Sequence, residues 1–354
     1  MRTAPRLVAP LVVLVLVALG AVPTITGARG RGHRPHGAPP PHLPPPAEHA
    51  PEERARTTAA PVAPAAFRYT QLDVGQGDAA LLEAGDGPQA LIDLGPRGDA
   101  PALLAALDRA AGHLAWVLVS HGHTDHYGGL EAALALGKPS ELFVPASPEE
   151  GAEWARTLAH VRASGTRVVT HERGARLTLG AHVQLEVLAP SAPAIERSRS
   201  DVNANGVVVR ADHLLASCTH RFLFTGDAEL PTEARLVANP EALRADVLKV
   251  AHHGSGFSSS LRFLEAVAPR FAVISAGEGN DYGHPHANAL ERLLGVGARV
   301  LRTDLHGAVA FTSDEAGIAV ATEREVQAGA ENVAPGGGAE RLPKRHRPRH
   351  HHRP

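Results

Sequence analysis

The sequence has almost no cysteine and few aromatic residues. Only one of its 354 residues, Cys218, is a cysteine, and Phe, Trp and Tyr together make up 4%. A single cysteine excludes an internal disulfide framework and any zinc site built from several thiolates. The apolar fraction of 44% is ordinary, so the chain still has enough apolar residues for one large core.

The chain also lacks a strong net charge and a long hydrophobic run. Its formal net charge of −2 gives no general attraction to nucleic acids. The apolar run 7–19 is shorter than the roughly 20 residues that a membrane helix needs, and Pro10 interrupts it. It follows Arg2 and Arg6 and precedes small residues, a pattern typical of a secretory signal peptide. We therefore predict that residues 1–28 are a signal peptide or an uncleaved anchor, and that the protein is periplasmic or extracellular.

Two segments have a composition that does not support a packed core. Residues 29–66 are rich in Pro and His, which predicts an extended, disordered linker. Residues 327–354 end in a run of Arg and His, which predicts a disordered basic tail. Such a tail can contact the cell envelope or another anionic polymer, although a solubilising role is the simpler interpretation. Between these segments, residues 67–326 are predicted to form one domain.

Hydrophobic periodicity in this domain predicts sheets covered by helices. The expected helices are 101–111, 130–136, 149–163, 231–237, 261–267 and 288–294. The expected strands are 67–74, 79–83, 90–94, 116–120, 141–145, 167–170, 183–189, 206–210, 221–225, 247–250, 271–274 and 308–312.

The most informative cluster of the 22 histidines follows an apolar strand. His121 and His123 are one residue apart, so in extended backbone both side chains point to the same side. The following turn brings Asp125 and His126 toward the same space. Imidazole and carboxylate groups suit Zn, Fe or Mn. The run therefore predicts a metal site, with one ion at the first pair and a second ion at the other.

Two later strand ends supply further metal-binding groups. Asp227 follows the apolar residues 223–224, and a carboxylate there can bridge two cations, which lie about 3.5–4 Å apart in two-metal hydrolases. His252 and His253 follow the next strand. One of them completes the ligand set, and the other either supports a ligand from behind or is a proton donor. The sequence leaves that choice open, and we take His253 as the ligand and His252 as the catalytic residue.

Other loop residues are candidates for the substrate. The Gly- and Ser-rich stretch 254–260 precedes a helix, where free amides favour an anion, although simple helix capping is an equal alternative. From this stretch we take Ser255 as substrate-binding. In the loop 280–286, Tyr282 and His286 are predicted to bind substrate and His284 to act in catalysis. Gln76 and Asp78 lie in a Gly-rich turn that can line the entrance.

Together these motifs resemble the metallo-β-lactamase superfamily, and within it the hydrolase domain of the DNA-uptake channel protein ComEC and its free-standing relatives. The resemblance depends on seven motifs, at 72–79, 90–95, 121–129, 203–205, 224–227, 248–255 and 280–286. It implies an α/β fold of the αββα type, with two mixed sheets face to face, helices outside and metals at one edge.

The resemblance also implies roles for single residues. His121 and His123 would bind the first metal; Asp125, His126 and His253 the second; and Asp227 would lie between the two. Asp93 would brace the metal loop as structural support, and Asp125 would also act in catalysis. The expected cofactors are two divalent ions, with Zn the first choice and Mn the alternative.

The stretch before the bridging aspartate departs from the wider superfamily. A third histidine for the first metal is usual there, but His171, His182 and His213 lack a fitting context. The corresponding stretch reads Asn203-Ala204-Asn205. The first site would therefore be weakly held, more open or suited to a harder metal. Asn205 is taken as substrate-binding.

The predicted function is that of an exported metal-dependent hydrolase that uses a metal-activated water, most simply a phosphodiesterase or nuclease. One alternative is hydrolysis of a lactone, β-lactam or other carboxylic ester. Another is a non-catalytic envelope-binding protein. With one apolar segment, the chain cannot form an uptake channel by itself, and a phosphodiester or nucleic acid is the expected substrate.

Overall fold

The computed structural model describes residues 66–98, 101–110, 114–146 and 151–335. The predicted signal segment, the linker up to residue 65, and residues 336–354 of the predicted tail lie outside these ranges. Among the described residues, none of the helices combines the length and apolar character needed to span a membrane.

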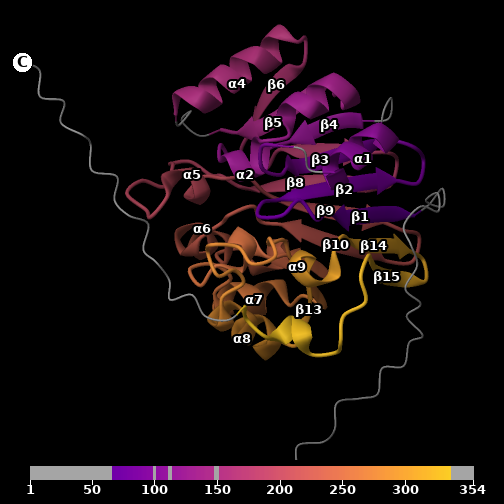
Figure 1. The fold of residues 1–354 in the computed structure, drawn as a ribbon, viewed down its shortest axis with the longest axis vertical. Helices are drawn as coiled ribbons and strands as arrows, with labels where there is room; N and C mark the ends of the chain where they lie inside the picture. The colour runs from indigo at the N-terminus through magenta and orange to yellow at the C-terminus, as the bar shows by residue number, and fades with distance from the viewer. Residues whose placement is uncertain (1–65, 99–100, 111–113, 147–150, 336–354) are drawn as a thin grey trace, which may run out of the picture. The chain divides into compact units, whose positions relative to one another are not determined.

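Two sheets make up the centre of the described fold (Figure 1). The eight-stranded sheet has the order β15-β14-β1-β2-β3-β4-β5-β6, and the seven-stranded sheet has the order β13-β12-β11-β10-β9-β8-β7. The first sheet contains β1 (Phe67–Gln71), β2 (Ala79–Ala84), β3 (Gln89–Leu94), β4 (Leu114–Leu118), β5 (Glu141–Pro145), β6 (Arg167–His171), β14 (Val309–Asp314) and β15 (Gly317–Thr322). The second contains β7 (Arg176–Leu179), β8 (Val183–Ala189), β9 (Val208–Leu214), β10 (Thr219–Phe224), β11 (Val247–Lys249), β12 (Phe271–Ile274) and β13 (Arg299–Arg302).

Helices cover the outer face of each sheet. Leu103 and Leu107 of one helix pack on the eight-stranded sheet, while Leu290 and Leu293 of another pack on the seven-stranded sheet. The α-helices are α1 (Pro101–Ala110), α2 (Thr124–Tyr127), α3 (Leu130–Ala132), α4 (Ala152–Ala163), α5 (Asp201–Ala204), α6 (Leu230–Leu236), α7 (Leu261–Val267), α8 (Ala287–Gly295) and α9 (Thr303–His306). Shorter helical turns are the π-helix η1 (Ala133–Gly137) and the 3-10 helices η2 (Pro240–Leu243), η3 (Ala251–Gly254) and η4 (Ala330–Asn332).

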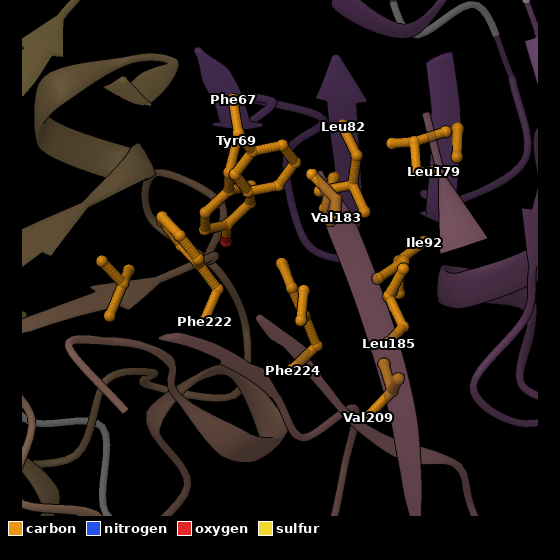
Figure 2. Close-up of a cluster of buried hydrophobic side chains, with 14 of the residues drawn as sticks. Phe67, Tyr69, Leu82, Ile92, Leu179, Val183, Leu185, Val209, Phe222 and Phe224 are labelled. Carbon is orange, nitrogen blue, oxygen red and sulfur yellow. The ribbon is translucent and has the colours of Figure 1, made fainter. Parts of the chain in front are cut away.

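The inner faces of the two sheets meet in a core rich in the chain's few aromatic residues. Figure 2 shows side chains of β1 and β10 directed toward one another. The ring centroids of Tyr69 and Phe224 lie 4.8 Å apart, and those of Phe67 and Phe222 lie 5.0 Å apart, both edge to face. The layers are thus helix, sheet, sheet and helix, which confirms the predicted αββα fold.

The parallel part of each sheet brings the chemical motifs to the ends of strands. Strands β3, β4 and β5 are parallel, as are β10 to β13. Carboxyl ends of parallel strands lie at the same edge of a sheet, where ligands commonly bind. Asp93 lies in β3, and the residues following β4, β10 and β11 include the predicted metal ligands.

The described chain continues in an ordered form beyond residue 326, where the tail was predicted to begin. The η4 helix follows, and the guanidinium of Arg302 donates to the backbone oxygens of Val333 at 2.5 Å and Glu331 at 3.4 Å. Residues 327–335 therefore pack against β13.

Candidate metal centre

Asp93 fixes the His-rich loop to β3. Its carboxylate accepts hydrogen bonds from the backbone amide of Ser120 at 2.7 Å, from the Ser120 hydroxyl at 2.8 Å, and from His126 Nδ1 at 2.8 Å. Asp93 has a left-handed backbone with φ of 58°, a conformation that is costly for a residue other than glycine. The arrangement is that of a buried brace under the metal loop.

The carboxylate of Asp227 lies between two sets of imidazoles. Its Oδ1 is 3.2 Å from His126 Nε2 and 3.7 Å from His253 Nε2. Its Oδ2 is 3.8 Å from His121 Nε2. Each oxygen of one carboxylate therefore faces a different set, which is the arrangement needed to bridge two cations.

Two groups of side chains have potential ligand atoms within 4.8 Å of one another. One contains His121, His123 and Asp227, and the other contains Asp78, His126, Asp227 and His253. The structure thus brings five of the six predicted metal residues into these groups. Asp125 is adjacent, with Oδ2 at 3.4 Å from His253 Nε2 and 3.7 Å from His126 Nε2.

Unsatisfied polar atoms test whether these residues fit a metal. His126 Nε2, His253 Nε2 and Asp227 Oδ1 are buried and have no hydrogen-bond partner among the described residues. The other nitrogens of both imidazoles are occupied, because His253 Nδ1 donates to the Ser275 carbonyl at 3.0 Å and His126 Nδ1 donates to Asp93. Buried polar atoms without partners are costly, and a divalent cation would satisfy all three. The residues therefore fit a bound metal ion.

The carboxylates around His126 favour positive charge. Burial alone would lower the pKa of His126, but Asp227, Asp93 and Asp125 outweigh it and raise the pKa well above its usual value. By contrast, burial and the neighbouring His126 lower the pKa of His121 well below its usual value. A proton on His126 would have to leave when a metal binds, so metal binding here is coupled to proton release.

The structure distinguishes His252 from His253. Both have left-handed backbones, with φ of 50° and 54°. His253 is 2% exposed and belongs to the second ligand group. The His252 side chain is 25% exposed, with Nε2 at 3.6 Å from Asp227 Oδ2 and Nδ1 at 3.4 Å from Glu229 Oε1. The geometry therefore favours His253 as the ligand, while His252 faces both the centre and solvent.

His284, which was predicted to act in catalysis, lies beside the centre. Its ring stacks near that of His253, with centroids 6.1 Å apart, and its Nδ1 is 3.4 Å from Gln76 Nε2. Burial, together with His253 and His252, lowers the pKa of His284 to about 3. The imidazole is therefore neutral near pH 7 and can accept or donate a hydrogen bond without carrying a transferable extra proton.

The predicted substrate residues differ in how their side chains are used. The Ser255 hydroxyl accepts from the Phe257 amide at 3.3 Å, and the Asn205 side chain pairs with the backbone of Ile195 at 2.8 Å in both directions. His286 accepts from the Gly256 amide at 2.8 Å and has its other ring nitrogen 3.2 Å from the Tyr282 carbonyl. These three side chains hold loops. Tyr282, 64% exposed, presents its ring to solvent.

In the Ser-rich stretch before α7, backbone amides already donate to a carboxylate of the protein itself. The carboxylate of Glu233 accepts from the amides of Ser259 at 2.5 Å and Ser260 at 2.9 Å. The Ser260 hydroxyl caps α7 by accepting from the Phe263 amide, and Arg292 donates to the carbonyls of Ser258 and Ser259, each at 2.8 Å. Of the two interpretations of this stretch, anion binding and helix capping, the structure therefore shows helix capping.

Sequence reasoning assigned Asp78 only to the entrance. The structure instead places it in the second group, 3% exposed. The sequence offered one signal for this position, because Asp78 ends a Gly-rich turn directly before β2. A carboxylate there faces the same sheet edge as the metal motifs.

Comparison with known proteins gives the same assignment as the geometry. Residues 72–278 match the metallo-beta-lactamase superfamily. The chain is 33% identical over 266 residues to Competence protein ComA of Neisseria gonorrhoeae, which covers 74% of this chain and 34% of that protein. It is 31% identical over 195 residues to ComE operon protein 3 of Bacillus subtilis, covering 55% of this chain and 24% of that protein. The alignments thus span about a quarter to a third of these relatives.

Solved structures include similar folds at low identity. The metallo-beta-lactamase fold protein YhfI from Bacillus subtilis has a TM-score of 0.43 and 16% identity, and covers 66% of this chain and 96% of that one. Rm3 metallo-beta-lactamase has a TM-score of 0.39 and 16% identity, covering 59% and 88%. With a family match that includes Asp93, the His-rich loop, Asp227 and His253, the chain belongs to the metallo-beta-lactamase superfamily and is a metal-dependent hydrolase.

Proposed function

We propose that this protein is an exported phosphodiesterase or nuclease with a dinuclear metal centre. The observation that carries the proposal is the Asp227 carboxylate, whose two oxygens face separate sets of imidazoles. A shared carboxylate of this kind suits two cations at the spacing of two-metal hydrolases.

In this proposal His121, His123 and Asp227 hold the first metal, and Asp125, His126, His253 and Asp227 hold the second. Asn203 takes the place of a third histidine near the first site. Asn203 is 3% exposed, and its Oδ1 has no hydrogen-bond partner within the described ranges. A few residues later the chain contacts the metal loop, because the Val207 amide donates to the Ser120 carbonyl at 2.7 Å. A first site of two imidazoles and a carboxylate, with an amide in place of a third imidazole, is compatible with Mn as well as the expected Zn.

Two divalent ions at these positions would supply an activated water and positive charge against the phosphate oxygens. His252 would protonate the leaving oxygen, because its side chain is 25% exposed and its Nε2 lies 3.6 Å from Asp227 Oδ2. Asp125 helps to hold the second ion. At the rim, the exposed Tyr282 ring lies nearly parallel to that of His284, with centroids 5.7 Å apart. A flat aromatic pair of this kind can stack on a nucleobase.

The relatives and the N-terminal sequence support the remaining parts of the proposal. One aligned relative is named a competence protein, which favours a nucleic-acid substrate over a lactone or β-lactam. The basic, apolar and small-residue order of residues 1–28 favours export. The basic C-terminal run would contact an anionic polymer of the envelope or the substrate itself.

The test uses the purified chain, stripped of metal and reloaded with Zn or Mn. Cleavage is measured on bis-p-nitrophenyl phosphate, single-stranded DNA, and a panel of lactones and β-lactams, with Asp227→Ala as the control. Metal-dependent cleavage of the phosphodiester or DNA, lost in the control, supports the proposal. Turnover of only the lactones or β-lactams would replace it with hydrolysis of carboxylic esters, and absence of any turnover would favour a binding role.

A further inference from the structure

A buried ion pair crosses between the two sheets beside the metal centre. Asp78 precedes β2 of the eight-stranded sheet, and Lys249 ends β11 of the seven-stranded sheet. Each is 3% exposed, and the Lys249 ammonium donates to Asp78 Oδ2. The same ammonium is 3.4 Å from the carbonyl of Gly226, the residue before Asp227.

Asp78 lies on the side of the imidazoles that faces away from Asp227. Its Oδ1 is 3.5 Å from His253 Nδ1, and its Oδ2 is 3.7 Å from His126 Nδ1. The nitrogens that face Asp227 are the Nε2 atoms of both rings. Although Asp78 is close enough to be a ligand, it lies behind two ligand imidazoles whose Nδ1 atoms bond to the Ser275 carbonyl and to Asp93, so its carboxylate adds negative charge beside both rings.

The backbone around Asp78 joins the same parts of the site. Its amide donates to the carbonyl of Asp125 at 3.1 Å, and the Ser275 hydroxyl donates to the carbonyl of Gly77 at 2.7 Å. The turn therefore contacts the metal loop on one side and the end of β12 on the other. Movement of Asp78 would shift ligands that come from both sheets.

Charge explains why Lys249 is needed. The Lys249 ammonium donates to Asp78 Oδ2, and each residue is 3% exposed, so each group has the other as its buried partner of opposite charge. Removing only one partner of a buried ion pair leaves an uncompensated charge, which is far more costly than removing both.

We propose that Asp78 and Lys249 are a positioning pair that sets the second metal site, by fixing His126 of one sheet relative to His253 of the other. The proposal rests on the dinuclear centre proposed above. It assigns neither residue to the ligand set. In the first site, His121 Nδ1 lies 3.0 Å from the Ser120 hydroxyl, which Asp93 holds, so that site should depend less on the pair.

The experiment compares Lys249→Met, Asp78→Asn and the double variant with the wild type. Metal content and both dissociation constants are measured by competition with a chromophoric chelator, and Mn–Mn coupling is followed by electron paramagnetic resonance. Arg302→Met is the matched control, because Arg302 and Asp304 form another buried ion pair on the seven-stranded sheet, with Nη2 and Oδ2 2.6 Å apart. Circular dichroism checks that each variant is folded.

We expect Lys249→Met to weaken the second metal by about 10–100-fold, the usual effect of losing an outer partner of a metal ligand, with little change at the first. The double variant should recover the melting temperature that Lys249→Met loses, because both buried charges are gone, while the second metal stays weakened because the pair is absent. Arg302→Met should lower the melting temperature without changing metal affinity.

Two results would overturn the positioning pair. One is unchanged affinity for both metals in Lys249→Met. The other is full loss of one metal in Asp78→Asn, which would make Asp78 a ligand. If the wild type binds one ion only, the dinuclear centre is wrong, and an unchanged affinity of Lys249→Met for that ion would then overturn the pair as well.

Discussion

Two neighbouring regions of the seven-stranded sheet carry residues that can bind charged ligands. At the end of β10, Asp227 faces the buried Nε2 atoms of His126 and His253, which have no hydrogen-bond partner in the described part of the chain. At the start of α7, the amides of Ser259 and Ser260 could hold an anion, but the Glu233 carboxylate already accepts from both.

The difference shows how a ligand site can be separated from a structural motif. Metal ligands converge on one point and leave lone pairs unused, so the fold has a cost that a cation would offset. The amides before α7 have an internal partner, so the fold is complete there without a ligand. Four substitutions test this contrast, from the largest expected effect to the smallest.

Asp227→Ala should have the largest effect. In the wild type, metal present at 1,000 times its dissociation constant should stabilise the folded protein by about 4 kcal/mol. The variant should lose that gain and all hydrolysis, because it removes a group shared by both sites. Thermal unfolding with and without metal measures the effect. Asp212→Ala, which removes a carboxylate paired with Arg210 on β9, should keep the full metal response.

Gly77→Ala should disturb the metal centre through packing. A Cβ at this position would overlap the carbonyl oxygen of Asp125 and lie 2.9 Å from Pro96 Cδ. We expect a loss of about 1–3 kcal/mol in the free energy of unfolding, with weaker metal binding. Gly87→Ala is the comparison, since a Cβ there meets nothing within 4 Å among the described residues and only its positive φ is strained. Equal metal affinity in Gly77→Ala and wild type would contradict this account.

Glu233→Ala should destabilise the protein without affecting the metal. It leaves two buried amides without their acceptor, at a cost of about 1–3 kcal/mol. Chemical denaturation measures the loss, and a chelator assay should show unchanged metal affinity. Glu233→Gln keeps one acceptor oxygen and should lose less. A gain in phosphate binding by Glu233→Ala would show that the amides can serve a ligand after all.

Ser258→Ala should have the smallest effect. Its hydroxyl is fully buried and has no hydrogen-bond partner among the residues that the structure describes, so its removal should leave stability unchanged or raise it by up to about 1 kcal/mol. Phosphodiester hydrolysis should be unchanged. A large fall in kcat/KM with stability intact would return this stretch to the substrate site.

The sequence predicted most strands of the two sheets but missed three of them. Arg176–Leu179, Arg299–Arg302 and Gly317–Thr322 are short or have polar residues at their ends, and they lie at or next to sheet edges. Strand pairing with a neighbour, rather than local periodicity, holds them in place. The helix predicted over 130–136 is divided in the structure into α3 and the π-helix η1.

Local sequence patterns could not predict which polar side chains are already hydrogen-bonded inside the protein. His286 and Asn205 are residue types that often bind a substrate. In the structure, however, His286 accepts from the Gly256 amide and Asn205 donates to the Ile195 carbonyl. The choice between His252 and His253 likewise required three-dimensional geometry, because adjacent residues of the same type differ only in where the turn directs them.

The sequence by itself determined the metal-binding residue types and their order along the chain, and its resemblance to a known family gave the αββα class. Residue type, hydrophobic period and strand-end position are local properties, and they predicted sheets covered by helices. Only the tertiary structure decided that Asp78 pairs with Lys249 across the two sheets and that Glu233 accepts hydrogen bonds from the amides before α7. Each of these contacts joins residues distant in the chain, so the packing of sheets and helices determines which buried polar groups become partners.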